Sequence, residues 1–520
     1  MRKIISKNDA MQLIKDGDVI GVAGFVGCGH PETLSATVEE TYLQSGHPRD
    51  LTIMFSAGIG DGKDRGTNHF GHDGLVKRII GGHYGLAPKL GKLVTENKVE
   101  AYNLPQGVLA HMFREAAGRK AGVLTKVGLG TYVDPRLEGG KLNAKTTENI
   151  VRVMEIEAEE WMYYKSIPLN VALIRGSTAD EDGNVTMERE AVYNEAISIA
   201  QAAKANNGIV IVEVERIAAN GTLDPKLVKV PGVVVDAIVI GDSDKFNQTF
   251  AEYYNPAYTG EVKIPVGSLP LIPLDERKII ARRAAMELVP NGRINLGIGV
   301  PEGVASVATE EGIGASMTLT VEGGAIGGIP AGGLSFGGSI NAQAMVDHTY
   351  QFDFYDGGNL DLTCLGLAQV DPVGNVNVSK FGPRVIGCGG FINISQNAKK
   401  VVFCGTLTTG GLAIDFKEGK LIIVKEGKAK KFIPTVEQVT FSGLYAQSIE
   451  QPVLYVTERA VFRLTKNGIV LTEIAPGIDL QTQVLDQMEC IVAVSPDLKL
   501  MDPRIFKDEP MGIAPEIMAK

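Results

Sequence analysis

The chain carries the same short sequence signals twice, in the same order, and this repeat limits the folds open to it. Residues 10–17 match residues 285–292 at four of eight positions, and each stretch precedes an apolar segment and then a Gly-x-Gly-x-Pro-Glu pattern. Further along, residues 180–185 and 371–376 share an Asp-x-x-Gly-Asn-Val pattern. Three matches in one order predict that a single domain has been duplicated.

Short apolar segments alternate with helical patterns in the first half. Val19–Ala23 and Leu51–Phe55 have the composition of buried strands. Val171–Arg175, a helix from about residue 188 to 203, and Ile209–Val214 predict a strand–helix–strand unit, which implies parallel pairing with a right-handed crossover. We therefore expect an α/β protein of two tandem, duplicated open α/β domains, with mainly parallel sheets and a cleft between the halves.

A proline-rich segment separates the two halves. Residues 255–274 contain four prolines and two glycines, which is typical of an extended connection. At 520 residues the chain is long enough for more than one hydrophobic core. The predicted organisation is an N-terminal domain at 1–254, a linker at 255–274 and a C-terminal domain at 275–520.

The bulk composition excludes several classes of function. A net charge of −10 and a pI near 5.4 argue against nucleic acid or an anionic membrane as the main partner. The five cysteines are scattered without a Cys-x-x-Cys pair, which indicates reduced thiols. The first residues lack the apolar stretch of a signal peptide, and no run of 18 apolar residues occurs. These features predict a cytoplasmic protein.

One carboxylate stands out because it lies between a strand pattern and a run of glycines. Ser316–Val321 is rich in Thr, Val and Leu, and Glu322 follows it directly, ahead of Gly323 and Gly324. Open α/β sheets bind ligands outside the carboxyl ends of their strands, and glycines allow close approach to the carboxylate. A second glycine run, Gly387–Phe391, could offer backbone N–H groups to an oxyanion. The alternatives are a solvated turn and a closely packed turn.

Other motifs suggest competing chemistry. Gly333–Gly337 is a Gly-x-Ser-x-Gly string around Ser335, but a nucleophile elbow needs a strand directly before it, and glycines and a proline stand there instead. Cys28 and Cys388 lie in glycine loops, either as acyl-accepting thiolates or as small buried residues. A histidine group lacks the spacing of a known metal motif and is interpreted as structural, with no metal site expected: His69, His72, Asp73 and His83.

The motifs together resemble the family I coenzyme A transferases over essentially the whole chain, and most closely the fused single-chain propionate (lactate/acetate) CoA-transferases. The strings that carry the resemblance are Gly24-Phe with Cys28-Gly-x-Pro-Glu32, Pro105-Gln-Gly107, Glu322 with its glycines, Gly358-x-Leu-Asp-Leu362, Gly387-x-Gly-Gly390, Tyr350–Gly358 and Glu473–Asp479. One position departs from the pattern, because Gly323 stands where this branch usually has Ser or Asn.

The resemblance implies a catalytic mechanism and a set of site residues. Glu322 would be the nucleophile of a ping-pong transfer of CoA between short-chain acyl-CoA (propionyl-, acetyl-, lactoyl- or butyryl-CoA) and a carboxylate, through a glutamyl-CoA thioester. The implied oxyanion donors are Gln106, Gly389 and Gly390. The implied CoA-binding loop is Gly297, Ile298, Gly299, Val300 and Pro301.

The resemblance also implies which ligands and partners to expect. CoA would serve as a substrate and transient covalent adduct, with no tightly bound cofactor and no metal. The partners would be acyl-CoA and short-chain carboxylates, and the protein would form a homo-oligomer, a dimer or a tetramer. Two alternatives stay open: an acyl-CoA hydrolase that admits water to the same Glu322, and a non-catalytic sensor of acyl-CoA or of a sugar phosphate. A requirement for a carboxylate acceptor distinguishes the first, and any turnover distinguishes the second.

Overall fold

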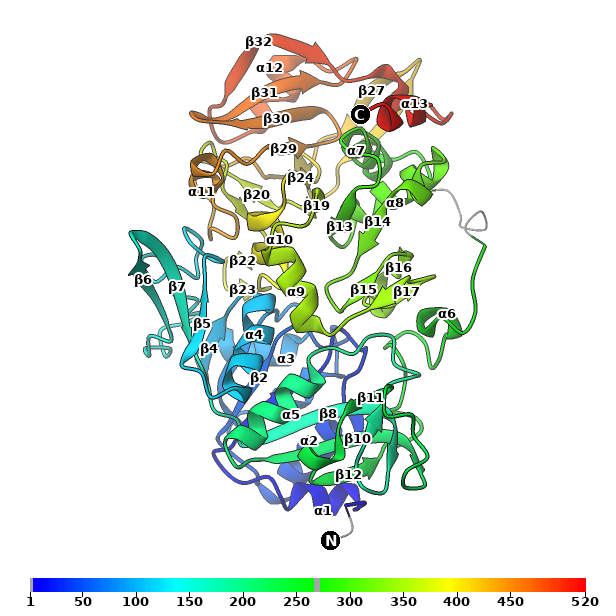
Figure 1. Ribbon diagram of the computed structural model, residues 1–520. Helices are drawn as coiled ribbons and strands as arrows, with labels where there is room; N and C mark the ends of the chain where they lie inside the picture. Colours follow the sequence, from blue (N-terminus) through cyan, green and yellow to red (C-terminus); the bar gives the residue numbers. More distant parts are fainter. Residues whose placement is uncertain (1–2, 266–271) are drawn as a thin grey trace. The chain divides into compact units, whose positions relative to one another are not determined.

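A computed structural model describes residues 3–265 and 272–520, which form two compact units (Figure 1). Unit 1 comprises residues 3–263, Val321–Asp353 and Ser379–Asn393, and unit 2 comprises the described parts of Ile264–Thr320, Phe354–Val378 and Ile394–Lys520. Two glycine-rich segments of the second half therefore pack within unit 1, so these compact units do not follow one boundary in the sequence. Backbone hydrogen bonds join these segments to the first half of the chain. The C=O of Ile386, for example, accepts hydrogen bonds from the N–H groups of Tyr84 and Gly85.

The sheet of unit 1 is mainly parallel. Its parallel strands run in the order β12 (Ala237–Ile240), β10 (Ile209–Ala218), β8 (Val171–Asp180), β1 (Val19–Val22), β2 (Leu51–Phe55), β3 (Val76–Gly81) and β4 (Glu100–Asn103). Short β9 (Val185–Thr186) and β11 (Val228–Val230) extend it in antiparallel fashion beside β8. Helix α5 (Ala196–Ala205) crosses in front of β8 in Figure 1, as the predicted strand–helix–strand unit requires.

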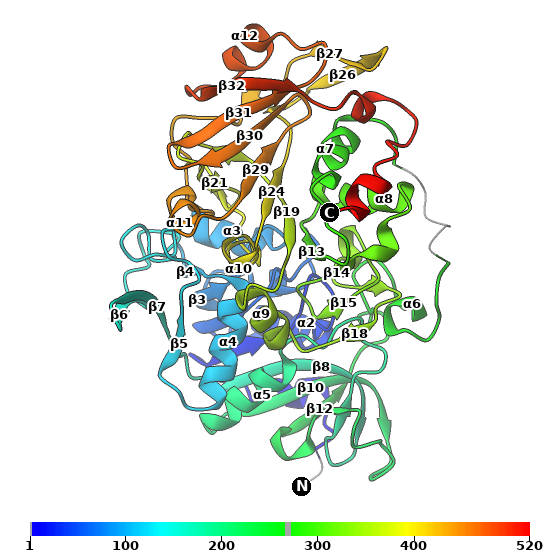
Figure 2. The ribbon, with the colours of Figure 1, turned by 45° about the horizontal axis from the view of Figure 1, so that its top comes forward.

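The sheet of unit 2 repeats this arrangement. Parallel strands β14 (Thr318–Thr320), β13 (Arg293–Leu296), β19 (Leu362–Gly366), β24 (Val401–Cys404) and β29 (Val453–Val456) lie in that order. In unit 1 the corresponding order is β2, β1, β8, β10 and β12. In both sets of five strands the first strand along the chain therefore lies between the second and the third, and the fourth and fifth follow the third. The antiparallel β30 (Ala460–Thr465) and β31 (Gly468–Ile474) and then β32 (Ala493–Leu500) continue the sheet (Figure 2). The predicted α/β fold with duplicated, mainly parallel sheets is confirmed.

The remaining elements connect or cover these sheets. The helices are α1 (Lys7–Met11), α2 (Glu32–Ser45), α3 (Pro88–Thr95), α4 (Gln106–Ala117), α5 (Ala196–Ala205), α6 (Pro256–Thr259), α7 (Glu276–Ala285), α8 (Gly303–Glu310), α9 (His348–Asp356), α10 (Phe391–Asn397), α11 (Gly443–Ser448), α12 (Leu480–Gln483) and α13 (Ala514–Met518). A separate antiparallel sheet consists of β5 (Gly122–Thr125), β7 (Glu159–Lys165) and β6 (Val151–Ile156). Short antiparallel pairs are β15 (Ala325–Ile326) with β18 (Ala344–Met345), β16 (Ile329–Pro330) with β17 (Ser339–Ile340), β20 (Gln369–Val370) with β21 (Val376–Asn377), β22 (Lys380–Phe381) with β23 (Arg384–Val385), β25 (Thr408–Thr409) with β28 (Ala429–Lys430), and β26 (Ala413–Lys417) with β27 (Lys420–Lys425).

Two sequence expectations need correction. The helix expected from residue 188 begins only at Ala196, because Asn194 has a left-handed backbone (φ 53°) that a helix does not accommodate. The start of the expected linker is packed, since Asn255 caps α6 and Ala257 and Tyr258 are buried. Residues 266–271 of that linker lie outside the described residues, and the boundaries at 254 and 275 stay a prediction.

The core of unit 1 surrounds its sheet. Strand β2 is buried along its whole length, as parallel strands covered on both faces are. A second apolar cluster, around Phe25, Val321, Ala325 and Phe336, packs behind the glutamate-bearing turn. Within the described residues, no helix is both long enough and apolar enough to cross a membrane.

Candidate active site

Glu322 lies in a tight turn directly after β14. The N–H of Gly324 donates to the C=O of Val321 at 3.0 Å, and the N–H of Val321 donates to the C=O of Ala325 at 2.9 Å. Glu322 is therefore the second residue of a four-residue β-turn. Its side chain is half-buried, while both following glycines are buried. The turn presents one partly accessible carboxylate on an otherwise packed loop.

Two segments brace this turn within unit 1. The N–H of Val346 donates to the C=O of Gly324 at 2.9 Å, and a Cβ on Gly324, where φ is 120°, would come within 2.0 Å of the Val346 oxygen. On the other side, a Cβ on Gly323 would lie 3.1 Å from a methyl group of Val192. Glycine is required at 324 by both backbone angle and space, which fixes the carboxylate's position.

Gln106 and the Gly387–Gly390 loop lie together beside the ends of the parallel strands. The N–H of Gln106 donates to the C=O of Gly389 at 2.9 Å, and the side-chain oxygen of Gln106 is the atom that a Cβ on Gly389 would approach, at 3.5 Å. The N–H of Gly389, however, donates to the C=O of Gly82 at 2.7 Å. That donor is occupied in this structure, which leaves the N–H of Gly390 as the backbone candidate for an oxyanion.

Asn103 holds this loop in place, a role that the sequence pattern did not indicate. Its side-chain amide donates to the C=O groups of Gly81 and Gly82, at 2.8 and 2.6 Å, and its oxygen accepts from the N–H of Cys388 at 2.9 Å. The hydroxyl of Tyr132 also donates to that oxygen. Since Asn103 is the last residue of β4, the glycine loop is anchored to the carboxyl end of the sheet.

A buried chain of polar side chains also ends at Gln106. The amide nitrogen of Gln106 lies 2.9 Å from Nε2 of His348, and Nδ1 of His348 lies 2.5 Å from Oε2 of Glu195. The hydroxyl of Ser56 donates to the other oxygen of Glu195 at 2.5 Å. His348 and Glu195 are fully buried. No sequence motif pointed to either residue, because each falls outside the glycine strings.

The predicted CoA-binding loop belongs to unit 2. Gly297 follows β13, and its N–H donates to the C=O of Cys364 at 2.8 Å. Gly299 has φ 87°, Ile298 is exposed, and Val300–Glu302 form one 3₁₀ turn. The loop therefore leaves the carboxyl end of a parallel strand. Of the predicted site residues, unit 1 contains Glu322, Gln106, Gly389 and Gly390, and unit 2 contains the loop from Gly297 to Pro301.

Ser335 does not have the surroundings of a hydrolase nucleophile. It lies in a 3₁₀ turn, Gly333–Ser335, and not after a strand. Its buried hydroxyl donates to Oε2 of Glu252 at 2.6 Å and lies 3.0 Å from the hydroxyl of Thr249. The hydroxyl thus serves a local hydrogen-bond network that anchors residues 249–252.

The two cysteines in glycine loops are buried thiols. Burial raises the pKa of Cys28 to about 12 and the pKa of Cys388 to about 12. A thiol with such a pKa carries almost no thiolate at neutral pH, and the thiolate is the nucleophilic form. Both side chains are buried, which supports the interpretation of Cys28 and Cys388 as small buried residues.

His69 and His72 pair with buried or partly buried glutamates. His69 contacts Glu32 at 2.9 Å and Glu39 at 2.5 Å, and His72 contacts Glu39 at 2.5 Å. His83 is separate, and burial lowers its pKa to about 4. Within residues 3–265 and 272–520, no group of three or more His, Cys, Asp or Glu side chains has the geometry to hold a metal ion.

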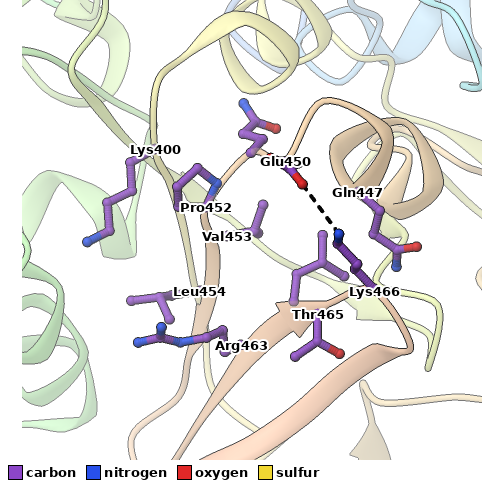
Figure 3. Close-up of a pocket in the computed structure, with 11 residues that line it drawn as sticks. Lys400, Gln447, Glu450, Pro452, Val453, Leu454, Arg463, Thr465 and Lys466 are labelled. Carbon is purple, nitrogen blue, oxygen red and sulfur yellow. Dashed lines mark ion pairs between the residues drawn. The ribbon is translucent and has the colours of Figure 1, made fainter.

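One cavity in unit 2 lies at the wrong edge of the sheet for catalysis. It has a volume of about 280 Å³ and is lined by Lys400, which precedes β24, and by Val453 and Leu454 at the start of β29. Figure 3 shows two of the lining residues, Lys466 and Glu450, joined by an ion pair of 3.4 Å. Active sites of open α/β sheets lie at the carboxyl ends of strands, whereas this cavity lies at the amino ends.

Known proteins with similar sequences are CoA-transferases. A sequence profile of the family described as coenzyme A transferase matches residues 4–241. The caffeate CoA-transferase of Acetobacterium woodii is 48% identical over 519 residues, covering 99% of both chains. The acetate CoA-transferase YdiF of Escherichia coli K12 is 43% identical over 516 residues, covering 99% of this chain and 97% of the relative.

A solved structure matches the whole fold. The acyl-CoA transferase YdiF of Escherichia coli O157:H7, crystallised as a thioester complex with CoA, superposes with a TM-score of 0.92 at 42% identity. The match covers 98% of this chain and 97% of that one. The similarity therefore extends across both halves and the loops between their strands.

Proposed function

The chain belongs to the family I coenzyme A transferases, in their fused single-chain form, and on this premise we propose that Glu322 is the nucleophile of its CoA transfer. The observation that carries the proposal is the turn itself. It places a half-buried carboxylate after a strand end, between two glycine-dependent contacts that fix its position. Glutamate has a reference pKa of about 4.3, so a carboxylate nucleophile needs no general base at neutral pH.

The first half-reaction transfers CoA to the enzyme. A carboxylate oxygen of Glu322 attacks the thioester carbonyl carbon, the C–S bond breaks, and CoA leaves as a thiolate. The thiolate then attacks the carbonyl carbon of Glu322 in the resulting anhydride. The C–O bond between the two acyl groups breaks, the first acid leaves as a carboxylate, and Glu322 holds CoA as a thioester. No proton is gained or lost in these steps.

The second half-reaction reverses these steps with another acid. The incoming carboxylate attacks the glutamyl thioester and forms a new anhydride, and the released thiolate attacks the carbonyl carbon derived from that acid. A new acyl-CoA leaves, and Glu322 returns as a carboxylate. The thioester bond energy is retained throughout, which agrees with the absence of a nucleotide-phosphate motif from the sequence.

Each tetrahedral intermediate carries an oxyanion that needs donors. We assign this role to the side-chain amide of Gln106 and the N–H of Gly390, with Gly389 shaping the loop through its hydrogen bond to Gly82. A single donor of this type lowers the activation free energy by about 2.7–4 kcal/mol. Gly297, Ile298, Gly299, Val300 and Pro301 are the proposed contact of unit 2 with CoA, because this loop follows a strand end and keeps Ile298 exposed.

The proposed substrates are short-chain acyl-CoA thioesters and short-chain carboxylates, and we propose that the protein acts as a homo-oligomer in the cytoplasm. One relative is an acetate CoA-transferase and another a caffeate CoA-transferase, so relatives of this chain differ in the acid that they use. A panel of carboxylate acceptors offered with propionyl-CoA and acetyl-CoA, read by product mass, tests the preference directly. Release of free CoA without any acceptor, at the rate of transfer, would instead identify a hydrolase.

Trapping the covalent intermediate tests the nucleophile. Acyl-CoA incubated without an acceptor should leave CoA attached to the protein, since the first half-reaction needs only one substrate. Hydroxylamine should convert the adduct to a hydroxamate on the peptide that contains Glu322, and E322Q should bind acyl-CoA but form no adduct. A label on Cys28, Ser335 or Cys388, or transfer without any label, would refute the assignment.

A further inference from the structure

The polar chain behind Gln106 has the arrangement of a positioning device. It joins four side chains that are each at least 98% buried: Ser56, which follows β2; Glu195, which precedes α5; His348, which begins α9; and Gln106, which begins α4. The contacts measure 2.5, 2.5 and 2.9 Å from Ser56 through to Gln106. Segments up to 242 residues apart in sequence meet in this network.

The hydrogen-bond roles follow from the chemistry of the groups. A carboxylate can only accept hydrogen bonds. Glu195 therefore accepts one from the N–H at Nδ1 of His348 and another from the hydroxyl of Ser56. In the neutral imidazole, Nε2 then carries a lone pair and accepts from the amide nitrogen of Gln106. This sequence of donors fixes which end of the Gln106 amide is nitrogen. Its second N–H is left to donate elsewhere, and its oxygen lies on the side of Gly389.

The same two segments that carry this network also brace the catalytic turn. A Cβ on Gly323 would lie 3.1 Å from Val192, and Glu195 follows Val192 by three residues. The N–H of Val346 donates a hydrogen bond to the C=O of Gly324, and His348 follows Val346 by two residues. The backbones are joined as well, because the N–H of His348 donates to the C=O of Asn194 at 2.9 Å. The position of the Glu322 turn and the orientation of the Gln106 amide are therefore set by one pair of segments.

Stability alone does not account for a buried network of this composition. Burying the carboxylate of Glu195 costs desolvation free energy, and replacing buried ionic groups by apolar residues of similar volume is often neutral or stabilising. The surroundings of His348 include apolar side chains, since the rings of Phe25 and Phe352 lie 6.1 and 5.2 Å from its ring. The polar network adds directional hydrogen bonds that orient the side-chain amide of Gln106, and an apolar core cannot supply these.

We propose that Glu195 and His348 are positioning residues that hold the amide of Gln106 with its N–H toward the oxyanion, so that the donor does not have to reorient during the reaction. This inference rests on the proposed role of Gln106 as an oxyanion donor. Without Glu195, the imidazole is free to place its proton on Nε2, which would turn the amide and present its oxygen instead. An oxygen there would repel the developing negative charge.

A double-mutant cycle tests the inference, with Q106A, E195Q and the double variant measured in the full-length protein. The readouts are kcat and the single-turnover rate of CoA adduct formation from acetyl-CoA. We expect Q106A to lower both by about 100-fold or more. We expect E195Q to lower them by about 10- to 100-fold with little change in KM, as residues behind a positioned histidine do in metal sites. The double variant should equal Q106A, because Glu195 acts only through that amide.

Three results separate the possibilities. If the double variant loses the product of the two single losses in rate, or if E195Q keeps the wild-type rate, the positioning role is overturned while Gln106 remains a donor. A wild-type rate for Q106A would refute the donor itself, and the adduct test on Glu322 would still stand. H69Q is the matched control, because it breaks another histidine–carboxylate pair of unit 1 that does not reach Gln106, and it should keep its rate. If E195Q does not fold, H348Q enters the same cycle with the same expected result.

Discussion

Replacing Gly324 by alanine should disable the turn that presents Glu322. The backbone at Gly324 has φ 120°, a region that residues with a Cβ rarely adopt. A Cβ there would lie 2.0 Å from the backbone oxygen of Val346, a group that cannot rotate away. The turn and the Val346 segment must then separate by about 1 Å, which also breaks the 2.9 Å hydrogen bond between Val346 and Gly324.

The magnitude follows from two costs. A side chain in the left-handed region costs about 1–2 kcal/mol, and overpacking a filled site costs about 1–3 kcal/mol. The free energy of unfolding should therefore fall by about 2–5 kcal/mol. The rate of adduct formation should fall by about 100-fold, since a misplacement of about 1 Å at a reacting group has that effect.

The assay is the single-turnover formation of the CoA adduct, measured beside thermal unfolding. G46A is the matched control: Gly46 also has a left-handed backbone, with φ 75°, but nothing lies within 4 Å of its Cβ position. G46A should lose about 1–2 kcal/mol of stability and keep its rate. If G324A forms the adduct as fast as G46A does, the turn does not depend on this glycine and the geometric argument for Glu322 fails.

Three further predictions follow from buried ionisable groups. C28A and C388A should each keep transfer activity within about tenfold, because neither thiol ionises at neutral pH; a loss of about a thousandfold with an intact fold would point to a thiolate nucleophile. Burial raises the pKa of Glu213 to about 7, so its contribution to stability is complete below about pH 4.5 and is lost as the pH rises to 7. The free energy of unfolding of E213Q, relative to the wild type, should rise by up to about 3 kcal/mol from pH 4.5 to 7.5 in denaturant titrations. A difference between the two proteins that does not change with pH would contradict this. For His69, burial lowers the pKa but hydrogen bonds to two glutamates outweigh it and raise the pKa to about 9. The stability deficit of H69Q should be full below pH 6.5 and shrink as the pH approaches 9, and a deficit that grows with pH would refute the pairing.

The sequence by itself determined the duplicated α/β architecture and the position of the candidate carboxylate. Both are local signals: a repeat is visible as letters in order, and a strand pattern followed by glycines marks a strand end wherever it occurs. The matching strand orders, β2-β1-β8-β10-β12 and β14-β13-β19-β24-β29, confirm the first inference. The catalytic role of Glu322 stays a prediction that the trapping experiment addresses.

Local pattern was misleading where the chain adopts an irregular path for a distant partner. Residues 188–195 have a helical composition, yet Asn194 takes a left-handed backbone there and its C=O accepts from His348. The backbone N–H of Gly389, a predicted donor, is used by Gly82. Periodicity reports which side of an element is buried, but it does not report which hydrogen-bond partner occupies a donor.

Only the tertiary structure brought Glu195, His348 and Asn103 to the site. Glu195 and His348 are 153 residues apart, and His348 and Gln106 are 242 apart, so no local spacing could link them. Their positions depend on parallel strands whose carboxyl ends meet at one edge of a sheet, and on two glycine-rich segments of the second half that pack within unit 1. The sequence names the residue types, whereas long-range backbone pairing decides which buried polar groups satisfy one another.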